Sequence, residues 1–224
     1  MAEVHVLVLA GNISHAELAV LEGFDNVNGE KVTYEQTNDR GLPGLDDADI
    51  LWIGQGEICE NAYFFDAATE GKIKSFVEKG GIVIPVGQDS DGGRPCEAGW
   101  TPVPITGVER GAVETFTVTD APEVGDLFTK PNEIANAHFD DTWTTPDEPY
   151  IMLASVGPQD IGFALLKHGS GFYIIAGIEN ENADDVAVNT PMMENLIHYA
   201  INLKNSVAVE YRGKLTSAWG KIKL

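Results

Sequence analysis

The chain has little positive charge for its size. Its 224 residues include 14 Lys or Arg against 35 Asp or Glu, which gives a net charge of −21. Nucleic-acid binding depends on Lys and Arg that neutralise phosphates, and anionic membrane surfaces likewise attract basic segments. We therefore expect neither nucleic acid nor a membrane as a partner, and we interpret the charge as a solvated acidic surface that keeps the protein in solution.

Long hydrophobic runs and cysteines are also scarce. No segment approaches the roughly 20 apolar residues of a membrane span, and the strand-like run 4–9 follows no basic, signal-like segment. A cytoplasmic location is the expectation. Cys59 and Cys96 are too few for a disulfide framework and match no zinc motif. We expect reduced, inert thiols, although a disulfide or a nucleophilic role for either cysteine stays open.

Apolar patterning predicts alternating strands and helices. Runs without polar alternation, such as 82–86, are typical of strands covered on both faces. Strands are predicted at 4–9, 31–36, 49–53, 82–86, 113–118, 151–156, 162–166 and 172–176, and helices at 14–24, 67–79 and 190–203. This order predicts an α/β fold, a flavodoxin-like three-layer sandwich with a mainly parallel central sheet and an antiparallel extension.

Turn and cap residues set the expected boundaries. Ser14 and Glu17 form a capping-box pattern, and Thr190-Pro191 is a typical helix start with Pro at the first helical position. Residues 88–111 and 120–148 are expected to be loop-rich. We predict one α/β domain over 1–205 and a basic C-terminal tail over 206–224.

Three segments carry a resemblance to a known superfamily. They are DDADILWIG (46–54), EGKIKSFVEKGGIVIPVG (70–87) and GSGFYIIAGIEN (169–180) with the closing helix 190–203. Together they resemble the class I glutamine amidotransferase-like superfamily. The subgroup they resemble most is the ThuA-like proteins and the related domains of carbohydrate-active enzymes.

The turn after strand 82–86 departs from that superfamily. Its glutaminase members carry a nucleophilic Cys in a G-x-C-x-G turn there, whereas this chain has Gly87-Gln88-Asp89, and Ser90 lacks the flanking glycines of a nucleophile elbow. ThuA-like proteins typically place a His at the end of that strand, and this chain has none. A Cys-His-Glu triad cannot be carried over, so we expect no glutaminase activity, because a thiolate nucleophile is its first requirement.

Polar residues follow several of the predicted parallel strands. The carboxyl ends of such strands meet at one edge of the sheet, where ligands bind in open α/β folds. The candidate ligand-binding residues are Gly11, Asn12, Gln55, Glu57, Gln88, Asp89, Glu179 and Asn180. Carboxylates brought together there need a cation or donor between them, and Arg94 is the nearest in sequence. Amide and carboxylate groups suit sugar hydroxyls or a cation; the alternative is that loop tips are simply polar.

A second cluster, His138, Asp140 and Asp141, combines imidazole with carboxylates, which are common metal ligands. ThuA-like proteins often carry acidic residues in the corresponding loop. A plain polar loop is the alternative, and no cofactor is expected.

These observations predict a member of the superfamily that is not a glutaminase. We expect a domain that binds a small molecule, such as a sugar or polyol, or an accessory domain. The alternative is a ThuA-like enzyme acting on a sugar derivative with carboxylate and His acid–base residues, with or without a metal. We expect binding rather than catalysis. Assembly into a homo-oligomer is left open.

Overall fold

The computed structural model describes residues 3–11, 15–58, 64–88, 96–113, 115–144, 148–157 and 160–222, with the backbone alone at His15, Glu109, Asp140 and 207–222. The predicted site residues Asn12 and Asp89 lie outside the described residues. So do Ser14, Cys59 and Arg94.

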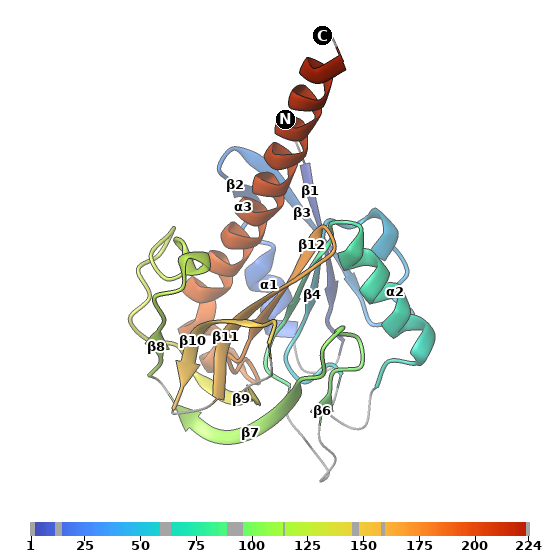
Figure 1. Ribbon diagram of the computed structural model, residues 1–224. Coiled ribbons are helices and arrows are strands. Elements are labelled where there is room, and N and C mark those ends of the chain that lie inside the picture. The colour runs from blue at the N-terminus through green and yellow to red at the C-terminus, as the bar shows by residue number, and fades with distance from the viewer. Residues whose placement is uncertain are drawn as a thin grey trace.

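One sheet forms the centre of the molecule (Figure 1). Its strands are β1 (Glu3–Leu9), β2 (Asn26–Val27), β3 (Glu30–Thr37), β4 (Ile50–Ile53), β5 (Ile82–Pro85), β6 (Cys96–Glu97), β7 (Thr106–Val113), β8 (Thr117–Val118), β9 (Phe139–Thr144), β10 (Ile151–Val156), β11 (Asp160–His168) and β12 (Gly171–Ala176). The helices are α1 (His15–Leu21), α2 (Ala67–Glu78) and α3 (Ala183–Ile222), with short 3-10 turns η1 (Leu45–Asp47) and η4 (Pro122–Val124).

The parallel part of the sheet has the order β3-β1-β4-β5-β12. This is the flavodoxin-like order, in which the chain first steps to one side of β1 and then continues on the other. The switch point therefore lies at the carboxyl ends of β1 and β4. The predicted α/β class and its parallel centre are confirmed.

The antiparallel extension is larger than the sequence indicated. Beyond β12 it continues as β11, β9, β7 and β6, with β10 and β8 branching from β11. The predicted hairpin of β11 and β12 is confirmed, but 113–118 is not one strand, and β6, most of β7 and β9 fall in segments expected to be loops. Those strands contain Gly, Asp and Glu, which are depleted in strands, so cross-strand pairing contributes more to their formation than the propensity of these residues does.

Side chains alternate between two cores on opposite faces of the sheet. Val4, Val6 and Val8 of β1 join the core that contains Met193 and Ile197 of α3. Leu7 and Leu9 join the core that contains residues of α2. Figure 1 shows α1 and α3 on one side of the sheet and α2 on the other, which confirms the three-layer arrangement.

The start of α3 differs from the prediction. Asn182 caps it, since its Oδ1 accepts hydrogen bonds from the backbone N of Asp184 (2.9 Å) and Asp185 (3.2 Å). The helix begins at Ala183, seven residues before the expected start at Thr190, and Pro191 lies inside it. Its far end runs to Ile222 and includes most of the predicted tail, and in Figure 1 that end projects beyond the rest of the molecule.

Candidate functional site

The loops after β1 and β4 meet at the switch point. The backbone N of Gly11 donates to Glu57 Oε1 (2.7 Å), and Arg40 Nη2 lies 3.3 Å from Glu57 Oε2. A Cβ at Gly11 would lie 2.9 Å from Cβ of Asn38, so glycine permits this approach. Gly11 and Glu57 therefore come together. The cation beside the buried carboxylate is Arg40, from the loop after β3, and the expected Arg94 lies outside the described residues.

A bridge between two buried carboxylates lies next to this contact. The side-chain amide of Gln55 donates from Nε2 to Asp141 Oδ2 and to Glu179 Oε2, the latter over 3.1 Å. The three side chains are 3%, 6% and 4% exposed. One amide carries two hydrogens, so it can serve both carboxylates. Oε1 of Gln55 has no hydrogen-bond partner among the described residues.

Glu17 of α1 is a further buried carboxylate next to this bridge and was not among the predicted site residues. Its Oε2 accepts from Trp52 Nε1 (3.0 Å) and its Oε1 from Asn180 Nδ2 (2.6 Å). Complete burial raises the pKa of the Glu17 carboxyl to about 7, although these hydrogen bonds lower it and the charge of Glu57 raises it further. A signal was present, because a Trp on a buried strand needs an acceptor for its indole N–H.

Asn189 of α3 connects the network to the ends of two strands. Its Nδ2 donates to the carbonyl of Glu179 (2.6 Å) and to Oδ1 of Asn180 (3.2 Å). Its Oδ1 accepts from the backbone N of His138 (2.8 Å). The sequence assigned Asn189 to the segment before the expected helix start, so its inward position was not foreseen.

Gln88 follows β5 and precedes position 89, at which the turn compared above with the G-x-C pattern has Asp. Gln88 is fully buried. Its Oε1 accepts from the backbone N of Ile58 (3.1 Å), and its Nε2 donates to the carbonyls of Gly54 (2.8 Å) and Val86 (2.6 Å). Gln88 thus fastens the loop after β4 to the end of β5, as a brace inside the site.

The metal candidates have separate partners. His138 Nδ1 lies 2.9 Å from Asp185 Oδ1 on α3, whereas Asp141 bonds to Gln55. The side chain of Asp140 lies outside the described residues. Within the described part of the chain, no group of three His, Cys, Asp or Glu side chains is arranged to hold a metal ion.

Cys96 departs from the expectation of two reduced thiols, because it is disulfide-bonded. Cys59, the other cysteine of the chain, lies outside the described residues.

Among the helices that the structure describes, none is long and apolar enough to cross a bilayer.

Among the described residues, the carboxyl edge holds four carboxylates that are at most 6% exposed: Glu17, Glu57, Asp141 and Glu179. Amide side chains and the guanidinium of Arg40 lie beside them. Carboxylate oxygens can accept hydrogen bonds from hydroxyl groups, and the raised pKa of Glu17 lies close to neutral pH.

Comparison with known proteins shows similarity of fold only. No protein-family model and no curated protein sequence matches the chain. A ThuA-like protein from Bacteroides uniformis has a TM-score of 0.55 and 9% identity, over 91% of each chain. A GMP synthase-type protein from Thermoplasma acidophilum has a TM-score of 0.54 and 12% identity, over 95% of this chain and 98% of that one.

A third structure, the exo-β-1,4-mannosidase Op5Man5 from an Opitutaceae bacterium, has a TM-score of 0.54 and 12% identity. It is matched over 89% of this chain but only 36% of its own length, so this chain spans about a third of that enzyme. The fold neighbours thus include ThuA-like and amidotransferase-type proteins, as the sequence resemblance implied.

Proposed function

We propose that this protein binds a small polar molecule, of the sugar or polyol class, at the carboxyl edge of its parallel sheet and does not hydrolyse glutamine. The observation that carries the proposal is the burial of four carboxylates at the carboxyl edge of the sheet. Burying a carboxylate is unfavourable, and well-packed apolar side chains in such places are often as stable or more stable. Binding of a ligand to these carboxylates would explain why they are buried at this edge.

The class of ligand follows from the donors and acceptors. Gln55, Asp141 and Glu179 offer several carboxylate and amide oxygens within one small region, including the unpartnered Oε1 of Gln55. Neighbouring hydroxyl groups of a sugar are matched donors for such oxygens. The presence of this fold within a mannosidase supports a carbohydrate-related role, as a binding or accessory domain.

The expectation of no glutaminase activity rests on residue identity after β5. The G-x-C pattern places the required thiolate at position 89, where this chain has Asp89. Gln88 beside it is held by backbone groups through both its nitrogen and its oxygen.

A second candidate function is acid–base catalysis on a sugar derivative. The observation that favours it is Glu17, whose pKa of about 7 suits a group that takes and returns a proton at neutral pH. His138, paired with Asp185 at the same end of the sheet, is the imidazole that this alternative would use.

The test is a binding screen of the full chain against monosaccharides, polyols and glutamine, read by ligand-observed NMR and followed by calorimetry. We expect a polyol or sugar to bind, and Glu179→Gln to weaken binding by about tenfold or more, since it removes a charge that accepts hydroxyl hydrogens. The exposed Asp126→Asn is the matched control and is expected to bind like the wild type.

Two results would contradict the proposal. One is a hit whose affinity is the same in Glu179→Gln and in the control. The other is release of ammonia from glutamine. Turnover of a sugar derivative that disappears in Glu17→Gln while binding persists would favour the catalytic alternative.

A further inference from the structure

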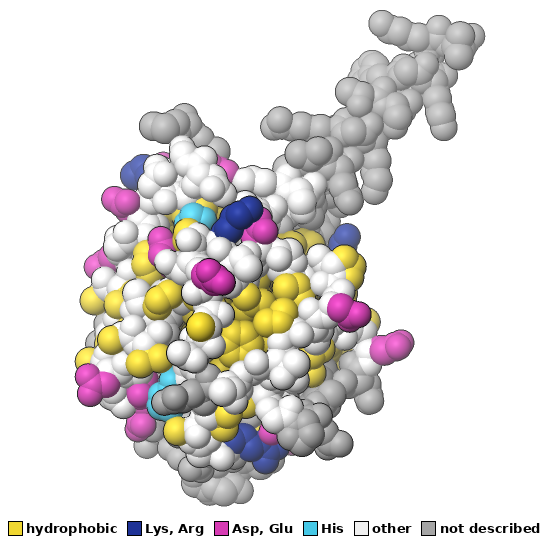
Figure 2. All heavy atoms as spheres, turned by 90° about the vertical axis from the view of Figure 1, so that its left-hand side faces the viewer, with side chains coloured by type: hydrophobic (Ala, Val, Ile, Leu, Met, Phe, Trp, Pro, Cys, Tyr) yellow, Lys and Arg dark blue, Asp and Glu magenta, His cyan; other side chains and the backbone are white. Residues whose placement is uncertain are grey.

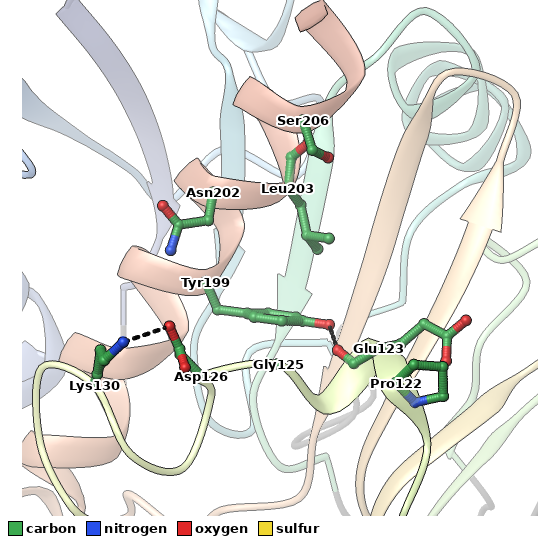
Figure 3. A pocket seen from close by; sticks show the side chains of 9 residues that line it. All are labelled: Pro122, Glu123, Gly125, Asp126, Lys130, Tyr199, Asn202, Leu203 and Ser206. Atoms are coloured by element: carbon green, nitrogen blue, oxygen red, sulfur yellow. Dashed lines mark hydrogen bonds and ion pairs between the residues drawn. The ribbon is translucent and has the colours of Figure 1, made fainter. Parts of the chain in front are cut away.

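A hollow, here called the η4 hollow, lies between the loop that contains η4 and one face of α3 (Figure 3). Its volume is about 390 Å³, and small-molecule sites in proteins have volumes of roughly 300–1,000 Å³. Figure 2 shows this side of the molecule, where hydrophobic side chains gather near the centre with acidic side chains around them. The hollow is separate from the carboxyl edge, because Tyr199, its first residue on α3, lies about 15 Å further along the helix than Asn189.

Four residues of α3 form one wall of the η4 hollow. They are Tyr199, Asn202, Leu203 and Ser206, and steps of three, four and seven residues from the first place them on one face of the helix. Tyr199 is 7% exposed, and its hydroxyl donates to the carbonyl of Glu123 (2.5 Å). This bond holds the phenol ring between the helix and the loop, as Figure 3 shows. The wall is therefore in place before a ligand binds.

The loop wall adds apolar surface and little bulk. Pro122 is the first residue of η4 and lines the hollow. Gly125 has a φ of +50°, and a Cβ at this position would lie 3.9 Å from Cε2 of Tyr199, so the glycine leaves this edge of the ring uncovered. With Leu203, these groups give the hollow an apolar lining. A flat aromatic ring suits it, because such rings pack favourably on a Tyr ring in offset or edge-to-face arrangements.

The charged side chains around the η4 hollow favour a neutral ligand. Asp126 Oδ2 pairs with Lys130 Nζ over 3.0 Å, so these two charges balance each other. Glu123 also lines the hollow, but it is exposed and therefore hydrated. An anion would be repelled by Glu123 and by a protein of net charge −21. A cation would gain little from carboxylates that water and Lys130 already satisfy.

Asn202 provides a hydrogen-bond donor at the η4 hollow. Its Oδ1 accepts from Asn28 Nδ2 (3.1 Å), whereas its own Nδ2 has no acceptor among the described residues. Figure 3 shows this nitrogen on the side of the residue that faces Asp126 and Lys130, across the hollow from α3. An amide nitrogen of this kind donates to a carbonyl oxygen. The hollow thus combines an apolar lining with a donor.

We propose that the η4 hollow binds a small, neutral aromatic compound that carries a carbonyl oxygen. The ring of the ligand packs on Tyr199, Leu203 and Pro122, and its carbonyl accepts a hydrogen bond from Nδ2 of Asn202. The ion pair of Asp126 and Lys130 lies at the rim, where it keeps charged compounds from gaining a partner. This site goes beyond the one proposed at the carboxyl edge, since it uses other residues and another class of ligand.

Four probes of similar size test the class of ligand. Acetophenone has a phenyl ring and a carbonyl, ethylbenzene has the ring without the carbonyl, benzoate is an anion and 1-phenylethylamine is a cation. Titrations followed by NMR of the full chain measure each dissociation constant. We expect acetophenone to bind about threefold or more tightly than each of the others, which is the effect of one hydrogen bond. The methyl signals of Leu203 are expected to shift, which places the probe in the hollow.

Two pairs of variants test the residues. Ser206→Phe puts a ring into the hollow and is expected to weaken acetophenone binding about tenfold or more, because it replaces the apolar contact of the ligand. Asn205→Phe, at the exposed neighbouring position outside the hollow, is the matched control. Asn202→Ala is expected to weaken acetophenone about threefold and to leave ethylbenzene unchanged, since only acetophenone uses the donor. Asn205→Ala is its control, and the melting temperature checks the fold of each variant.

Three results would overturn the proposal. The first is no binding of acetophenone up to the limit of its solubility. The second is an affinity for ethylbenzene, benzoate or 1-phenylethylamine that equals or exceeds that for acetophenone. The third is equal weakening by Ser206→Phe and Asn205→Phe, or an equal effect of Asn202→Ala on acetophenone and ethylbenzene. Glu179→Gln, the variant of the carboxyl-edge site, is expected to bind acetophenone like the wild type, so the two proposals can fail separately.

Discussion

The two edges of the parallel sheet differ in how far their charged side chains are buried. At the amino edge, Asp49 pairs with Lys204 over 2.6 Å, and both side chains are about 30% exposed. Asp46 and Lys79 line an open hollow beside them. At the carboxyl edge, Asp141, Glu179 and Glu17 are buried, and their hydrogen bonds include ones from amide and indole N–H groups.

The difference in burial affects the stability of the charged form of each carboxyl group. Water and a nearby cation satisfy the aspartate of the amino edge, so its ion pair contributes little. At the carboxyl edge Glu17 is completely buried, and this desolvation raises the pKa of its carboxyl group although neutral N–H donors bond to it. Substitutions at the two edges are therefore expected to differ in size and in pH dependence.

The largest effect is expected from Gln55→Ala. It removes two hydrogen bonds to buried carboxylates, each worth roughly 1.5–3 kcal/mol, so the free energy of unfolding should fall by about 3–5 kcal/mol. Denaturant unfolding measures it. Gln36→Ala, which removes an exposed glutamine bonded to the carbonyl of Ala10, is the matched control and should stay within about 1 kcal/mol. Equal losses in the two variants would show that the bridge is not needed.

The next effect is a pH dependence centred on Glu17. Burial raises its pKa in the folded protein from 4.5 to about 7. Between these values the unfolded chain releases the Glu17 proton while the folded protein keeps it, so the folded state loses stability as the pH rises through this window. The total is about 3 kcal/mol, fully lost above pH 7.

Glu17→Gln is expected to remove this part of the slope when unfolding is measured from pH 4 to pH 8. Glu22→Gln, at an exposed site one residue after α1, serves as the control and should keep the wild-type slope. If wild type and Glu17→Gln show the same pH profile, Glu17 is ionised throughout and its pKa is not raised.

A smaller loss is expected for Asn189→Ala. This change leaves the carbonyl of Glu179 and the backbone N of His138 without their amide partner in a fully buried place. The expected loss is about 1–3 kcal/mol by thermal or denaturant unfolding. Asn205→Ala on the same helix, where the side chain is exposed, should change stability by less than about 0.5 kcal/mol.

The smallest effect is expected at the amino edge. Lys204→Met removes the ion pair with Asp49 but keeps the stem of the side chain. Stability should fall by no more than about 1 kcal/mol at low salt, and by less at high salt, because exposed pairs are screened. A loss as large as that of Gln55→Ala would erase the contrast between the two edges.

The sequence predicted the positions of much of the site. The apolar runs define the parallel strands, and the carboxyl ends of such strands lie at one edge of the sheet whatever the side chains are. The site residues that follow these strands are Gly11, Gln55, Glu57, Glu179 and Asn180. Glu17 and Asn189 were missed because a helix position by itself does not show which side chains it will meet.

By itself, the sequence determined the parallel centre of the sheet and the lack of a cysteine after β5. These depend on residues near one another in the chain, through burial pattern and residue identity. Only the tertiary structure decided that β7 and β9 are strands, that Gln88 is a buried brace and that Gln55 joins Asp141 to Glu179. Those features depend on partners between 26 and 124 residues apart, and nothing in the local pattern specifies such partners.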